Sequence, residues 1–359
     1  MQKELSLLER WRVSYSDSCD AVDGLTLDVP EQEMWQGACG YEFLKEEILP
    51  QMAAPPYGRI AAEKLSDRKP VYLFREETKN IMVVGKFCRH GSRGLQEAWT
   101  VAEREHFIIQ LLRRRMGMDD GIYRVVRPLG KKKELGALLV TEWAPGRTLD
   151  HYIAEAIYNG AHQDLFNRLG HLAAFFAKLH RPTATSRRNS LREPAWYFGK
   201  LMESLGAEIL EPPARNCLEE VAARWWQEDG IFAEDREVLV HGDATPCNFL
   251  FDGEGVTGID LERSRVADRC WDLGFVTAEL KHHFMWRMGD GWAAEPFIGH
   301  FLWEYAVRLG DDRFFQPITR RMPLYMALGL LRIARNSWLD EPHRRNLLRE
   351  AQGCLTYGL

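Results

Sequence analysis

Residues 238–262 read VLVHGDATPCNFLFDGEGVTGIDLE, and this stretch decides the fold that the sequence predicts. The apolar run Val238–Val240 predicts a strand that opens into a polar loop over 241–248. A short strand over 249–251, a turn over 252–255 and a returning strand over 256–260 follow. This arrangement places Asp243, Asn248 and Asp260 at the ends of two strands.

The spacing of these polar residues matches a template for phosphoryl transfer. In the pattern H-R-D-L-x-x-x-N, followed later by D-F-G, the first Asp acts as base and the Asn and second Asp hold Mg²⁺. His241, Asp243 and Asn248 fall at the template's three offsets, with Gly242 in place of Arg, and Asp260 follows after a hairpin. A carboxylate and an amide supply the oxygen ligands that Mg²⁺ prefers. The spacing therefore predicts Asp243 as base and Asn248 and Asp260 as magnesium ligands.

A small sheet with one helix is predicted before this stretch. The β-rich runs Val71–Phe74 and Ile81–Phe87 flank a polar segment and predict a hairpin, and further strands are predicted over 123–126 and 138–141. Period-2 alternation puts Lys86 on the face opposite Val83 and Phe87. Apolar residues at helical spacing predict a helix over 96–115. In the template, a lysine on the sheet and a glutamate from this helix serve the nucleotide phosphates.

The remaining sequence is mostly helical. Thr148 is a predicted N-cap, and residues 164–180 form a strongly amphipathic pattern. The fold class is therefore α+β and bilobal. The predicted divisions are a mostly helical N-terminal extension over 1–57, with helical patterns at 2–11 and 41–52, a nucleotide-binding small lobe over 58–144, and a larger helical lobe over 145–359.

Composition excludes several classes of protein. The 359 residues carry a formal net charge of −5, which disfavours nucleic acid or an anionic membrane as partner. No apolar run approaches the length of a membrane span, and the charged start MQKELSLLERWRV is not a secretory signal. Seven cysteines without a CxxC pair fit reduced thiols. These features predict a cytoplasmic protein.

Several motifs together resemble the aminoglycoside phosphotransferase and choline kinase superfamily, whose fold is similar to that of protein kinases. HGDATPCN (241–248) resembles its HGDxxPxN loop, and GIDLERSRVADRCWDLG (258–274) resembles its I-D-x-E followed by D-x-x-x-D-L. The supporting segments are VVGKF (83–87), AEREHFIIQLLRRRMG (102–117), LLVTEWAPGRTLDHYI (138–153) and LAAFFAKLH (172–180). Together they cover roughly residues 70–280 in the expected order.

This resemblance implies an ATP- and Mg²⁺-dependent kinase of small molecules and assigns its site. It implies that Asp243 is the base, that Asn248 and Asp260 bind Mg²⁺, and that Lys86 contacts the phosphates. The partner of Lys86 is expected to be Glu105, with Glu103 as the alternative. The other implied positions are a hinge that meets adenine (Thr141, Glu142, Trp143 and Ala144), a metal or substrate contact (Glu262) and an anchor of the catalytic loop (Asp272).

The acceptor is expected to be a hydroxyl of a small molecule. An aminoglycoside or amino sugar is the first choice, because acidic residues outnumber basic ones and a cleft lined by carboxylates would favour an amine. Choline, homoserine or a plain sugar are alternatives with the same catalytic loop. Cys247 at a usual glycine position and the glycine-free segment Lys64–Pro70 leave open a nucleotide-binding pseudokinase. Gly242 and the absence of an A-P-E segment argue against a protein kinase.

Three further residue patterns receive structural interpretations. His241 is expected to hold the loop by hydrogen bonds, since the template gives it no proton to move. Adjacent His282 and His283 are expected to be partly exposed helix residues and not a metal site, because neighbouring residues do not share a helical face. The basic run 131–133 is expected to form a solvated hairpin turn.

Overall fold

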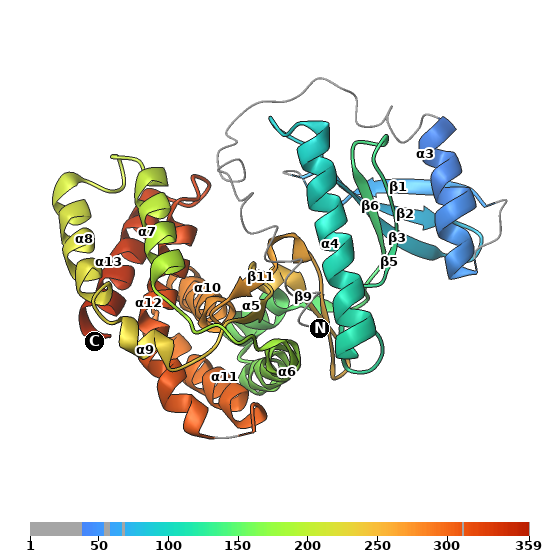
Figure 1. Ribbon diagram of the computed structural model, residues 1–359. Coiled ribbons are helices and arrows are strands. Elements are labelled where there is room, and N and C mark those ends of the chain that lie inside the picture. The colour runs from blue at the N-terminus through green and yellow to red at the C-terminus, as the bar shows by residue number, and fades with distance from the viewer. Residues whose placement is uncertain (1–37, 54–57, 67–68, 311, 359) are drawn as a thin grey trace. The chain divides into compact units, whose positions relative to one another are not determined.

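The computed structural model describes residues 38–53, 58–66, 69–310 and 312–358 (Figure 1). Its described residues divide into two compact units, one of 38–145 with 257–263 and one of 146–256 with 264–358. Each unit is therefore assembled from separate segments of the chain, and Asp260 and Asp243 belong to different units. The helical pattern at residues 2–11 lies outside the described residues.

The first unit is built on a five-stranded antiparallel sheet. The strands lie in the order β1-β2-β3-β6-β5, and their bounds are Ile60–Lys64, Val71–Glu76, Ile81–Phe87, Leu138–Glu142 and Pro128–Lys132. Strands β2 and β3 form the predicted hairpin, in which Val71 pairs with Lys86 and Glu76 with Ile81. The predicted strand over 123–126 corresponds to β4 (Tyr123–Val125).

Helical segments cover both faces of this sheet. The run α3 (Ala38–Glu42), η2 (Phe43–Ile48) and η3 (Leu49–Met52) packs onto the face that carries Phe74 and Val83. Helix α4 (Leu95–Met116) packs through Ala98 and Ala102 onto the opposite face, beside Leu139. Figure 1 shows α3 and α4 on opposite sides of the sheet. Lys86 pairs with Leu139 in the sheet register and alternates with buried Val83 and Phe87, so its side chain extends on the α4 side.

The basic run 131–133 is not a solvated turn. Lys131 and Lys132 belong to strand β5, and the turn comes after them. Lys131 lies over the Trp99 ring, 4.7 Å from its centroid, and pairs with Glu103 at 2.8 Å. The long aliphatic stem of a lysine covers apolar surface while its charged end finds a partner, which allows such a run to occupy a strand.

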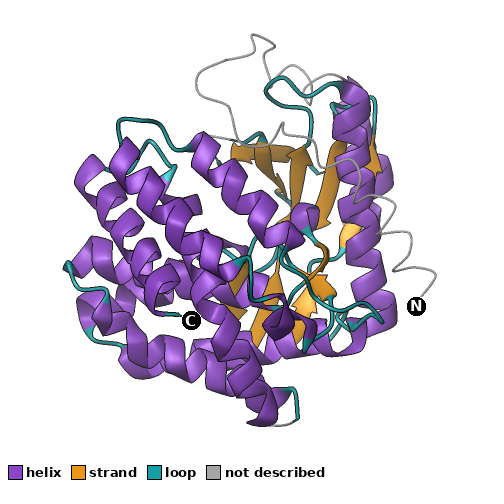
Figure 2. Ribbon diagram, turned by 60° about the vertical axis from the view of Figure 1, so that its left-hand side comes forward, coloured by secondary structure: helices purple, strands orange, loops and turns teal. Residues whose placement is uncertain are grey.

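The second unit is mostly helical (Figure 2). Thr148 caps α5, accepting a hydrogen bond from the amide of His151 at 3.4 Å, and the amphipathic pattern at 164–180 lies within α6. Among the described residues no helix is both long and apolar enough to cross a membrane. The bounds are α5 Leu149–Asn159, α6 His162–His180, α7 Arg192–Ser204, α8 Pro212–Trp225, α9 Asp229–Ala233, α10 Cys270–Met288, α11 Glu295–Arg308, α12 Phe315–Ala334 and α13 Glu341–Tyr357.

Short strands interrupt these helices, as the sequence predicts. Strand β8 (Val238–Val240) pairs with β11 (Arg265–Ala267), and β9 (Phe249–Asp252) pairs with β7 (Arg147–Thr148). Strand β10 (Gly255–Gly258) follows β9 after a tight turn. The loop between β8 and β9 is thus held at both ends by sheet pairing, which fixes the position of the polar residues it carries.

Helices α10 and α12 approach each other closely through two glycines. A Cβ on Gly274 would lie 2.4 Å from the Cβ of Tyr325, and a Cβ on Gly329 would lie 2.5 Å from that of Ala278. Real side chains do not approach this closely, so both positions require glycine for the helices to pack. This close packing brings Glu279 of α10 within reach of Arg332 of α12.

Candidate active site

The loop after β8 is anchored by one buried carboxylate. Asp272, near the start of α10, accepts hydrogen bonds from the backbone amides of His241 at 2.7 Å and Gly242 at 2.8 Å. His180 lies 3.0 Å from the same carboxylate through Nε2. Gly242 has φ +81°, a conformation that a residue with a side chain adopts only with strain. The structure confirms the predicted anchoring role of Asp272.

Within this loop, His241 and Asn248 hold the backbone around Asp243. The amide of Asp243 donates to Nδ1 of His241 at 3.4 Å, and Nδ2 of Asn248 donates to the carbonyl of Asp243 at 2.9 Å. His241 is fully buried, and its hydrogen bond confirms the structural role that the sequence predicted for it. Because Nδ2 makes this bond, Oδ1 of the same amide group is the atom of Asn248 that could act as a ligand.

The carboxylate of Asp243 forms an ion pair that the sequence did not reveal. Nη2 of Arg332 lies 2.5 Å from Oδ1 of Asp243, and Nη1 lies 3.5 Å from Oε1 of Glu279. Burial raises the pKa of Glu279 to about 7; Arg332 opposes this rise, and Asp243 and Asp150 add to it. Asp243 is therefore close to two further carboxylates and one guanidinium in the same unit.

In the sheet unit, Lys86 lies among three carboxylates. Its Nζ is 3.1 Å from Oε2 of Glu105 and 2.6 Å from Oε2 of Glu262, and it also pairs with Asp260. Glu105 additionally accepts a hydrogen bond from the amide of Leu261 at 3.1 Å, which ties α4 to the segment that carries Asp260. Lys86 therefore pairs with Glu105, whereas Glu103 pairs with a lysine of β5.

The charged groups of this cluster shift one another's pKa values. Burial raises the pKa of Glu105 to about 7; Lys86 opposes this rise, and Asp260 and Glu262 add to it. Burial disfavours the charge on Lys86, but Asp260, Glu105 and Glu262 outweigh burial and raise the pKa of Lys86 well above its ordinary value. Burial alone would raise the pKa of Glu262, yet Lys86 and Lys69 hold it well below its ordinary value. Lys69 reaches Glu262 at 3.2 Å and Asp260 at 3.5 Å. The sequence did not point to Lys69, because it lies in a loop without periodicity.

Asp260 also has an unusual backbone conformation. Its φ of +58° lies in the left-handed region, which residues other than glycine seldom adopt and which Asp tolerates better than most. Strained backbone of this kind often marks functional sites. The strain fixes the direction in which the chain presents the Asp260 carboxylate beside Lys86.

The four predicted hinge residues continue from strand β6. The amide of Glu142 donates to the carbonyl of Arg127 at 2.9 Å, and the amide of Trp143 donates to the carbonyl of Met82 at 3.3 Å. The carboxylate of Glu142 accepts from the amide of Arg127 at 2.8 Å. The amides of Glu142 and Trp143 are thus already engaged. A backbone contact between this hinge and adenine would use the amide of Ala144 or the hinge carbonyls.

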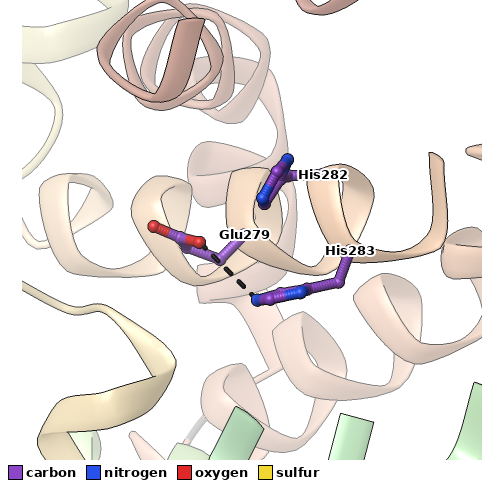
Figure 3. A group of neighbouring side chains, drawn as sticks. All are labelled: Glu279, His282 and His283. Atoms are coloured by element: carbon purple, nitrogen blue, oxygen red, sulfur yellow. Dashed lines mark ion pairs between the residues drawn. The ribbon is translucent and has the colours of Figure 1, made fainter. Parts of the chain in front are cut away.

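His282 and His283 are both buried, which corrects the prediction of partial exposure. They lie on α10, a helix contacted by α5, α11, α12 and α13, and this packing from several directions buries both side chains. Figure 3 shows Glu279 and His283 reaching toward each other from successive turns, with His282 above them, and one ligand atom from each lies within 4.8 Å of the others.

These three residues already have other partners. Nδ1 of His282 lies 2.8 Å from Nε2 of His343, and Nε2 of His283 lies 3.3 Å from Asp150 and 3.9 Å from Glu279. Glu279 also pairs with a guanidinium. We therefore interpret the group as part of a buried polar network and assign no metal to it.

The chain belongs to the phosphotransferase enzyme family, whose sequence profile matches residues 69–307. This match covers well over half of the chain and includes both the Lys86 cluster and the catalytic loop. The protein is thus a small-molecule phosphotransferase with the bilobal α+β fold related to that of protein kinases. A search of curated proteins finds no significant match.

Three solved structures illustrate the fold. The ethanolamine kinase of Plasmodium vivax superimposes with a TM-score of 0.55 at 13% identity, covering 94% of this chain and 95% of that one. A glucosamine kinase gives 0.53 at 15% identity, covering 88% and 84%. The complex of streptomycin, ATP and APH(2")-IIa gives 0.54 at 13% identity, covering 93% and 100%.

Proposed function

We propose that this protein transfers the γ-phosphoryl group of ATP to a hydroxyl of a small molecule that carries an amino group. The observation that carries the proposal is the loop after β8, which has Asp243 and Asn248 at the spacing of the phosphoryl-transfer template. Asp272 holds the start of this loop through two backbone amides, and Asn248 donates to the carbonyl of Asp243. The Lys86 cluster supplies the second part of the same template. Both belong to a chain of the phosphotransferase enzyme family.

In the proposed reaction, Asp243 orients the acceptor hydroxyl and accepts its proton. The acceptor oxygen forms a bond to the γ-phosphorus as the bond from that phosphorus to the ADP oxygen breaks, so ADP leaves with the electron pair. Because this transition state is loose, positioning and charge neutralisation supply most of the rate enhancement. The rigid anchoring of the loop by Asp272 serves the positioning.

The nucleotide is proposed to meet residues of the sheet unit. Lys86, oriented by Glu105, would pair with the ATP phosphates, and the hinge from Thr141 to Ala144 would meet the adenine. The proposed ligands of Mg²⁺ are the carboxylate of Asp260 and the amide oxygen of Asn248, because Mg²⁺ prefers oxygen donors. When bound, Mg²⁺ would neutralise charge on the β and γ phosphates.

The proposed amino group of the acceptor rests on carboxylates near Asp243. Asp150 and Glu279 both lie in the second unit, and each acts electrostatically on its neighbours in this group. Glu279 is mostly buried and pairs only loosely with its guanidinium at 3.5 Å, so an ammonium group would stabilise its charged form. The names of the similar structures, which include ethanolamine, glucosamine and streptomycin, agree with an amine acceptor.

Matched pairs of acceptors test this proposal. We expect amine-bearing acceptors to exceed their amine-free analogues in kcat/KM by about 10- to 100-fold, as a hydrogen bond to a charged group is worth that much. Glucosamine against glucose and ethanolamine against ethylene glycol are suitable pairs, with ADP release and phosphorylated product as readouts. In Glu279→Gln the preference should shrink. Equal turnover within each pair would refute the amine requirement. If no amine, sugar or hydroxy amino acid were phosphorylated, the kinase proposal itself would be refuted.

Removing the charge of Lys86 should impair nucleotide use more than acceptor binding. For Lys86→Met we expect kcat/KM for ATP to fall by about 10²-fold or more, because a positioned cation on the phosphates is lost. The acceptor KM should change little, and steady-state kinetics with ATP and acceptor varied separately measure both. Lys79→Met, which alters an exposed lysine of the same sheet's turn, is the matched control. An unchanged ATP dependence in Lys86→Met would contradict the assigned role.

A further inference from the structure

Arg332 contacts the proposed base from a part of the chain that the family profile does not reach. It lies on α12, whereas the matched region ends at residue 307. Its Nη2 approaches Oδ1 of Asp243 to 2.5 Å, and the side chains of Arg332 and Asp243 are only 15% and 11% exposed. Ion pairs this far removed from water restrain side-chain geometry more strongly than exposed ones do.

The guanidinium of Arg332 is itself restrained by α10. Nη1 lies 3.5 Å from Oε1 of Glu279, and the guanidinium carbon lies 5.1 Å from the centroid of the Phe275 ring. The tight approach of α10 and α12 at Gly274 and Gly329 sets the separation between these groups. The planar guanidinium therefore has a fixed carboxylate on one side, a ring near it, and Asp243 at its other nitrogen.

This geometry restricts how Asp243 presents its two oxygens. The catalytic loop fixes the backbone of Asp243, but its side chain still has two rotatable bonds. Arg332 engages Oδ1, so its guanidinium restrains the rotation of the Asp243 carboxylate about these bonds. Lysine would not replace this function fully, because its ammonium is a flexible point charge and lacks the planar fork of arginine.

We propose that Arg332 is a positioning residue that orients the carboxylate of Asp243 for phosphoryl transfer. The inference rests on the proposed role of Asp243 and adds a residue outside the region that the family profile matches. It also explains why α12 and α10 require glycine at their contact: a wider separation would draw Arg332 away from the catalytic loop.

The proposal predicts a defect in turnover without a defect in binding. For Arg332→Gln we expect kcat to fall by about 10- to 100-fold, because misplacement of a catalytic group costs up to this much. The KM values for ATP and acceptor should stay within about twofold, since groups that act only in the transition state leave ground-state binding intact. Arg332→Lys should recover part of the loss. Arg320→Gln, at an exposed position of the same helix, is the matched control.

A double-mutant cycle distinguishes an action through Asp243 from a general structural effect. In an Asp243→Asn background, Arg332→Gln should cause little further loss of kcat, because the carboxylate it orients is already gone. Single-turnover phosphoryl transfer at high enzyme concentration measures the residual rates, and thermal unfolding of every variant checks the fold. Equal losses in both backgrounds, or a raised KM at unchanged kcat in Arg332→Gln, would overturn the inference.

The same experiment separates this inference from the proposed function. If Asp243→Asn alone retains full activity, the assignment of the base is wrong and the inference falls with it. If Asp243→Asn loses activity while Arg332→Gln keeps the wild-type kcat, the base stands and only the positioning role is refuted. Should Arg332→Gln unfold, Arg332→Lys in the two backgrounds provides the same comparison with the charge retained.

Discussion

Asp243→Asn should lose about 10³-fold in kcat, which is the range that loss of a general base produces. Asparagine has nearly the same shape and keeps an oxygen that can accept from Arg332. It cannot accept a proton, however, so the acceptor hydroxyl would remain protonated at the moment of attack. The backbone of the loop is held by Asp272 and does not depend on this side chain, so the variant should fold normally.

ATP binding provides the complementary readout for this variant. The proposed phosphate contacts of Lys86 belong to the other unit, so titration with a fluorescent ATP analogue should give a wild-type Kd for Asp243→Asn. Asp252→Asn, which changes an exposed aspartate at the end of β9, should leave kcat unchanged. If kcat of Asp243→Asn stayed within about threefold of wild type, the loss would be far smaller than removal of a general base causes. Asp243 would then not be the base.

The parts of the site that the sequence predicted follow from local patterns. Strand alternation was enough to place Lys86 on the face opposite Val83 and Phe87, and the structure shows that α4 covers this face. The resemblance carried by the motif at 268–273 implied the anchoring by Asp272, and the structure shows the corresponding hydrogen bonds. Short-range patterns therefore predicted the strands that position the loop and the lysine, and these strands are present in the structure.

The residues that the sequence missed meet through packing between distant segments. Arg332 lies 89 positions after Asp243, on a helix whose pattern reveals an apolar face but not the partner of a particular arginine. His282 and His283 were expected to be partly exposed, because adjacent positions point in different directions. Both are buried since helices pack around α10 from several directions. Such burial depends on the arrangement of whole helices, which no local spacing encodes.

Removal of Asp272 should have the largest effect on stability. This carboxylate is fully buried and accepts from the amides of His241 and Gly242, at 2.7 and 2.8 Å. Burial lowers the pKa of His180 despite the opposing effect of Asp272, so the imidazole is neutral near pH 7. A neutral His180 donates its Nε2 hydrogen to Asp272 and accepts at Nδ1 from the hydroxyl of Tyr305, 2.8 Å away. One side chain thus serves three donors.

For Asp272→Ala we expect the free energy of unfolding to fall by about 3–5 kcal/mol, because three buried donors lose a charged acceptor. Asp272→Asn should also be destabilising, because its NH₂ group would replace one accepting oxygen and would face one of the three donors. Urea denaturation followed by circular dichroism measures both. Asp290→Ala is the control: this exposed aspartate after α10 accepts one backbone amide, from Trp292 at 2.8 Å, so its loss should cost only about 1 kcal/mol.

The kinetic effect of Asp272 separates anchoring from chemistry. If Asp272 acts through the loop, Asp272→Asn should have a lower kcat than the wild type at a temperature where the variant is still folded. The reason is that His241 and Gly242 would no longer fix the backbone that carries Asp243. The Asp290→Ala control should keep full activity. A stable Asp272→Asn variant with wild-type kcat would mean that β8 and β11 pairing alone holds the loop in its active conformation, and the carboxylate would then be dispensable for positioning.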